Sequence, residues 1–129
     1  MYKIGEFSKI VNIPIRTLRF YDDCGVLQPD DIDRYTGYRY YTDENVVECE
    51  LVKLLKSVNF TLEEIALVKD NIDETIIEQK QEEIKQEIRK MEKKVEMLSV
   101  MKNHIKKDQP KVYKMIEKIK EEEIWKKKF

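Results

Sequence analysis

A cluster of polar and aromatic residues near the N-terminus has the side-chain types that read DNA. An arginine can donate two hydrogen bonds to one guanine, which is the commonest specific contact in the major groove. A second arginine on the same helix can reach a phosphate, which orients a protein without reading sequence. The cluster predicts a recognition surface for double-stranded DNA, made by Arg16, Thr17, Arg19, Phe20 and Tyr21.

A second such cluster lies in residues 34–41, Arg-Tyr-Thr-Gly-Tyr-Arg-Tyr-Tyr. The Thr36-Gly37 pair between two tyrosine-containing segments is typical of a β-hairpin, and side chains alternate along the strand that follows. We expect this hairpin to lie beside the recognition helix as a wing, with Tyr41 in the core. Guanidinium and phenol groups bind phosphate there, and the predicted contacts are Arg34, Tyr38, Arg39 and Tyr40, extended by Lys56.

The sequence has few of the residues and motifs that are typical of enzymes. There is one histidine, His104, and none of the glycine-rich, nucleophile-elbow or zinc-protease motifs occurs. Cys24 and Cys49 are too far from each other and from His104 in sequence to suggest a zinc site. We interpret both cysteines as small core residues. The chain is therefore expected to have no enzyme activity, no metal and no cofactor.

Short helices should carry the DNA-reading residues. Lys3–Val11 has an apolar stripe with helical spacing, and a second helix is expected over Ile15–Asp23. Pro14 suits the start of that helix and Gly25 its end. Two short helices with such a turn outline a helix-turn-helix, although many proteins contain similar pairs.

Two further helices should follow the hairpin. Thr42 and Asn45 have the spacing of a helix-capping box, and Thr61 and Glu64 repeat it. The first helix is expected to reach about Ser57. The side chains predicted to face the core are Val46, Val47, Leu51, Leu54 and Leu55 in that helix and Leu62, Ile65, Leu67 and Val68 in the next.

A long helix is expected from about residue 73 to 107, with apolar residues in a heptad pattern. Charged residues occupy most other positions, so the apolar stripe is narrow and needs a partner. A second copy of the chain is one candidate, because two-fold dimers dominate oligomers. Packing on the chain's own short helices is the alternative. We call this stripe the seam, and its predicted interface residues are Ile77, Ile84, Ile88, Met91, Val95, Leu98 and Ile105.

Composition limits the remaining choices. The 129 residues suit one ordinary domain. No run of about 18 apolar residues is present, and the first residues do not resemble a secretory signal. We therefore expect a cytoplasmic protein without membrane contact. Residues 108–129 predict a short amphipathic helix that includes Val112, Met115, Ile116 and Ile119, or the start of a truncated effector domain.

Five motifs, in order and with the right spacing, resemble the N-terminal domain of MerR-family transcription regulators. They occupy residues 4–9, 15–22, 25–29, 37–42 and 62–65. The resemblance implies a mainly α fold: a winged helix-turn-helix with a small β-hairpin wing over residues 1–71, followed by a long antiparallel coiled-coil dimerisation helix over 72–107. The family usually has two tyrosines where this chain has Phe20-Tyr21.

The resemblance also implies a function. A sequence-specific homodimer would bend and untwist promoter DNA and so act on RNA polymerase indirectly. A small-molecule effector is a further partner that the family suggests, although about 22 residues after the long helix are too few for a ligand pocket of their own. The alternative is a coiled-coil protein–protein interaction module that does not bind DNA.

Overall fold

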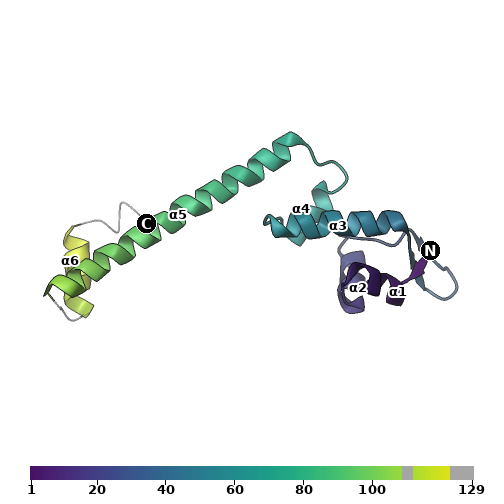
Figure 1. The fold of residues 1–129 in the computed structure, drawn as a ribbon, viewed down its shortest axis with the longest axis horizontal. Coiled ribbons are helices and arrows are strands. Elements are labelled where there is room, and N and C mark those ends of the chain that lie inside the picture. The colour runs from purple at the N-terminus through teal and green to yellow at the C-terminus, as the bar shows by residue number, and fades with distance from the viewer. Residues whose placement is uncertain (109–111, 123–129) are drawn as a thin grey trace. The chain divides into compact units, whose positions relative to one another are not determined.

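The computed structural model describes residues 1–108 and 112–122. Helices dominate it, as the sequence predicts, and two compact units divide at Ile77 and Glu78. The N-terminal unit contains β1 (Tyr2–Lys3), α1 (Ile4–Val11), α2 (Ile15–Asp23), β2 (Asp31–Ile32), β3 (Arg39–Tyr41), α3 (Asp43–Ser57), α4 (Leu62–Val68) and the start of α5 (Glu74–Asp108). The rest of α5 and α6 (Val112–Glu121) belong to the second unit (Figure 1). None of the described helices is long and apolar enough to cross a membrane.

The turn between α1 and α2 follows from local chemistry. Asn12 ends α1 in the left-handed conformation, at φ 56°, which asparagine tolerates better than most residues. Pro14 follows as the N-cap of α2, where its missing N–H costs nothing. Gly25, at φ 76°, comes directly after the C-cap of α2. The predicted bounds of α2 are confirmed.

The small sheet has the strand order β1-β3-β2, with both pairings antiparallel. The predicted hairpin is therefore present, as β2 and β3. The sequence pattern missed β1, whose two residues pair with the other edge of β3. The central strand β3 thus connects the wing to the start of the chain.

The core of the N-terminal unit lies where α1, α2, α3 and β3 meet (Figure 1). The ring of Tyr41 stacks on Phe7, with centroids 4.2 Å apart and planes 8° from parallel. Leu18, Val52 and Ile65 add buried apolar contacts from three helices. Tyr41 is a core residue, as predicted.

The buried face of α3 differs from the prediction. Val47 and Leu54 are 69% and 62% exposed, whereas Cys49, Val52 and Leu55 face the core. The reason is Asn45, which is fully buried and completes the Thr42 capping box. Its amide also donates to the carbonyl oxygen of Gln28, at 3.3 Å, and this contact fixes the rotation of the helix.

Two other core predictions are wrong. Leu67 is 83% exposed, because α4 has only seven residues and its Leu62, Ile65 and Val68 already occupy the inner face. Cys24 is exposed at the C-cap of α2, while Cys49 is buried as expected. Burial raises the pKa of the Cys49 thiol.

In the second unit, α6 packs on the C-terminal part of α5. Met115 and Ile119 are buried, and Glu122 lies 3.4 Å from Nε2 of His104. Ile116 is partly exposed instead. The predicted contribution of the Val112 side chain lies outside the described residues.

Tyr41 yields a prediction about stability at high pH. Its hydroxyl is the one buried side-chain polar atom without a hydrogen-bond partner among the described residues. Burial, and secondarily the nearby Asp22 carboxylate, raise its pKa from 10.0 to about 12. A pKa raised on folding gives stability that is complete below pH 10 and is lost as the pH rises towards 12.

We expect Tyr41→Phe to be neutral or mildly stabilising at pH 8, since it removes an unpaired hydroxyl. Urea unfolding at pH 11 should show the variant gaining about 1 kcal/mol relative to the unchanged protein. Tyr35→Phe is the matched control, because Tyr35 is exposed. A constant difference between pH 8 and pH 11 would contradict the account.

Candidate nucleic-acid interface

Helix α2 presents one apolar face to the core and one polar face to solvent. Leu18 and Tyr21 are buried, three residues apart on the inner face. Arg16, Arg19 and Phe20 are exposed, and Thr17 is half-buried. An exposed helix of this kind fits the major groove, which is about 12 Å wide.

Tyr21, one of the predicted DNA contacts, is almost completely buried. The side chain is 3% exposed, and Nζ of Lys56 donates a hydrogen bond of 3.2 Å to its oxygen. The same ammonium lies 5.9 Å from the centre of the Tyr21 ring. The contact places the exposed Lys56 of α3 beside α2, so the structure brings together two residues that the sequence assigned to DNA.

The wing tip is organised by Asp33. Its carboxylate accepts the backbone N–H groups of Tyr35 and Thr36, at 2.8 and 3.0 Å, and these bonds lower the pKa of Asp33. Gly37, at φ 73°, then reverses the chain. The turn leaves Arg34, Tyr35 and Tyr38 exposed at the tip.

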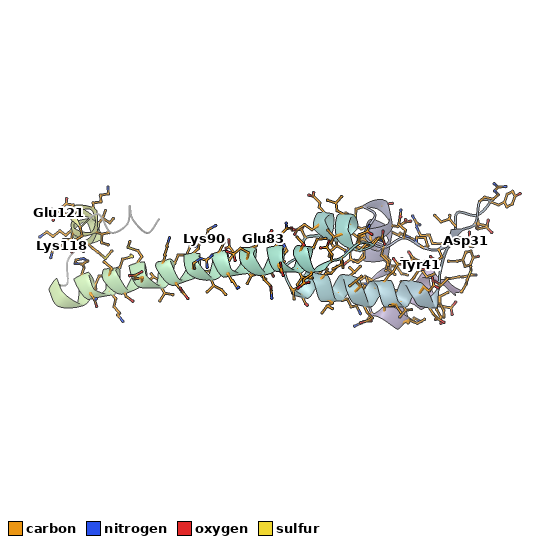
Figure 2. All side chains as sticks on the ribbon, turned by 90° about the horizontal axis from the view of Figure 1, so that it is seen from above. Asp31, Tyr41, Glu83, Lys90, Lys118 and Glu121 are labelled. Atoms are coloured by element: carbon orange, nitrogen blue, oxygen red, sulfur yellow. The ribbon has the colours of Figure 1, made fainter. Side chains whose placement is uncertain are left out.

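The strand that follows the tip connects the wing to α2. Nε of Arg39 donates to Oδ2 of Asp22 at 2.7 Å, and this bond raises the pKa of the guanidinium above its already high ordinary value. Tyr40, on the other face of β3, is half-buried and pairs in register with Lys3 on β1 and Asp31 on β2. Figure 2 labels Asp31 on the edge strand β2 and Tyr41 on the central strand β3.

A groove of about 570 Å³ lies between the start of α1, helix α2 and the wing. We call it the α2–wing groove. The residues that line it include Lys3, Glu6, Ile15, Arg19, Tyr38 and Arg39. Three cations and one carboxylate give it positive charge, which suits a phosphate of the DNA backbone.

Two residues of this region were missed by sequence reasoning. Lys3 lies in the groove with Nζ 5.8 Å from the centre of the Tyr38 ring. Asp22 holds Arg39. No local pattern could reveal either contact, since each joins residues far apart in sequence. The one visible signal was the Asp22-Asp23 pair in the last turn of α2, where no basic residue accompanies it.

The seam on α5 faces solvent in the described chain. Ile88, Met91, Val95 and Leu98 are exposed, as are Ile77 and Ile105, and Ile84 is partly buried. A shallow apolar groove of about 410 Å³ runs along Ile84, Ile88, Met91 and Val95, bordered by Glu87 and Glu92. Figure 2 shows side chains leaving α5 on several sides around Glu83 and Lys90.

Helix α6 does not use the seam. The residues of α5 that are partly buried near its C-terminal end are Met97, Val100, Met101 and His104. These positions follow a different helical stripe from Val95, Leu98 and Ile105. Helix α5 therefore has two apolar faces, of which the chain itself covers one.

Comparison with known proteins identifies the family to which this fold belongs. The profile of the MerR HTH family of regulatory proteins matches residues 2–72. The multidrug-efflux transporter 1 regulator of Bacillus subtilis is 42% identical over 69 residues. That match covers 54% of this chain but only 25% of the relative, so the chain spans about a quarter of its length.

Solved structures have a similar fold. EcmrR, determined by cryo-EM in a DNA complex within EcmrR-RPo, matches with a TM-score of 0.71 and 34% identity, over 84% of this chain and 41% of that one. The N-terminal part of the Bacillus subtilis multidrug transporter activator, MtaN, matches with a TM-score of 0.68 over 77% of this chain and 95% of that one. At 24% identity the second likeness concerns the fold alone. Because the family profile covers more than half of its residues, the chain belongs to the MerR HTH family of regulatory proteins.

Proposed function

We propose that the chain is a sequence-specific DNA-binding transcription regulator that acts on promoter DNA as a homodimer. The observation that carries the proposal is the exposed face of α2, where Arg16 is open to solvent and Arg19 lines the positively charged α2–wing groove. Arg16 reads base edges, and Arg19 and the wing hold phosphates. The likeness to EcmrR, which was solved in a complex with DNA, supports DNA binding by this fold.

The unpartnered seam supports the homodimer. An apolar stripe along a highly charged helix is stable in water only when another surface covers it. The second apolar face of α5 already binds α6, so the seam is available to a partner copy. Antiparallel pairing of two α5 helices about a two-fold axis would place one N-terminal DNA-binding unit at each end of the pair, which suits a palindromic operator.

Bending and untwisting of the promoter is the proposed mode of action. A dimer that holds its two DNA-binding units at a fixed spacing selects DNA whose shape matches that spacing. Bending DNA to such a shape costs about 1–6 kcal/mol. RNA polymerase would then respond to the altered DNA. A small-molecule effector remains a prediction drawn from the family resemblance.

The test uses a library of duplexes with a randomised central segment. We expect the protein to enrich a pseudo-palindromic sequence, and its affinity for that duplex to fall with salt by a slope of about −0.9 per phosphate contacted. Dimers that enrich no sequence and bind no duplex at low salt would support the alternative, a coiled-coil interaction module.

A further inference from the structure

The negative charge of Asp22 is unfavourable in its local surroundings. It lies in the last turn of α2 next to Asp23, where the helix dipole disfavours a negative charge, and that turn contains no basic residue. A carboxylate at the end of a helix that approaches DNA also repels phosphate. A residue that breaks a local rule in this way is often there for function.

The structure compensates for this charge with one specific contact. Asp22 accepts the Nε–H of Arg39 at 2.7 Å, and the two side chains are only 12% and 28% exposed. The contact uses Nε alone of the guanidinium nitrogens. The terminal nitrogens remain able to bind a phosphate, and Arg39 lines the α2–wing groove together with Arg19 and Tyr38.

The rest of the strand restricts Arg39 further. Tyr41, two residues along β3 and on the same face, is stacked on Phe7 in the core. The wing is thus attached to the core through Tyr41 and to α2 through Arg39. Among the described residues, the Asp22–Arg39 pair is the ion pair that joins the recognition helix to the wing.

We propose that Asp22 is a positioning residue for DNA recognition, which orients Arg39 so that the wing and the recognition helix engage the duplex in one fixed register. The inference rests on the proposed function. Without Asp22, Arg39 keeps its charge and can still find phosphates, but on any sequence and in several geometries. The loss therefore falls on the discrimination between sequences and spares overall affinity.

The experiment compares Asp22→Asn with Asp23→Asn, which makes the same charge change at an exposed neighbour. Fluorescence anisotropy gives Kd for the selected operator and for an unrelated duplex, over a range of salt. Both variants should bind the unrelated duplex equally well or more tightly. Only Asp22→Asn should lower the ratio of operator to unrelated affinity, by about tenfold, the effect of losing one charge-assisted hydrogen bond.

Three further variants separate positioning from a general structural effect. Asp22→Glu should restore the ratio to within about threefold, because a carboxylate can again accept from Nε. Arg39→Lys keeps the positive charge but lacks the separate Nε and terminal N–H donors of the guanidinium. It should therefore lower the ratio as Asp22→Asn does. In an Arg39→Ala background, Asp22→Asn should change the ratio no further.

Equal ratios for Asp22→Asn and Asp23→Asn would overturn the proposal, as would full additivity with Arg39→Ala. Should Asp22→Asn not fold, as judged by circular dichroism, Arg39→Lys decides the matter by the same ratio. Failure of the proposed function looks different, because the unchanged protein would then not distinguish operator from unrelated DNA at all.

Discussion

Met91→Lys should convert the proposed homodimer to monomers. Met91 lies midway along the seam between Ile77 and Ile105, and its side chain is exposed in the single chain. In an antiparallel pair with full overlap, the middle residue of one helix faces its own copy. The substitution would then bury two ammonium groups against each other, and an unpaired buried charge costs several kcal/mol.

Sedimentation equilibrium tests the result directly. The variant should sediment as a species of 15.6 kDa, the mass of one chain. Its circular dichroism spectrum should still be that of a folded, helical protein. Operator affinity should fall by about 10²–10⁴-fold, because each DNA-binding unit then binds its half-site without the effective concentration that linkage provides.

Gln86→Lys is the matched control for this change. Gln86 is exposed on another face of α5, and its amide bonds Glu82, a partner that a lysine can also reach. It adds the same charge without touching the seam, so the dimer should persist. A Met91→Lys protein that remained dimeric would show that copies of the chain meet through a different surface.

The sequence predicted those features that depend on neighbours in the chain. The bounds of α2 follow from Pro14 and Gly25, and the starts of α3 and α4 follow from capping boxes whose side chains lie three residues from the N-cap. Each of these signals acts within one or two helical turns. Local patterns therefore gave the order of the elements and the exposure of Arg16, Arg19 and Phe20 on α2, whereas Tyr21 is buried.

Features set by distant contacts were missed or wrong. The rotation of α3 depends on Asn45 reaching the carbonyl oxygen of Gln28, 17 residues earlier, so the apolar pattern of the helix alone selected Val47 and Leu54 as core residues. The Asp22–Arg39 bond spans the same sequence separation. Strand β1 has only two residues, too few to show periodicity. In each case the deciding contact joins two elements whose order along the chain follows from the sequence, whereas their relative positions in space do not.

Arg16→Ala should relax sequence preference more than it weakens binding in general. Arg16 is exposed near the start of α2, where a recognition helix contacts base edges. Loss of a bidentate arginine–guanine pair costs about 1–3 kcal/mol. Both DNA-binding units of a dimer carry the change, so operator affinity should fall by about 10²–10⁴-fold.

Arg19→Ala is the comparison that separates base reading from phosphate binding. Arg19 lines the α2–wing groove, and its loss should weaken operator and unrelated duplexes alike while reducing the salt slope by about 1 per DNA-binding unit. Arg16→Lys should not rescue Arg16→Ala, because a single ammonium cannot reproduce two parallel hydrogen bonds. If Arg16→Ala weakened both duplexes equally, Arg16 would be a phosphate contact, and the base-reading residues of α2 would have to be sought at Thr17 and Phe20.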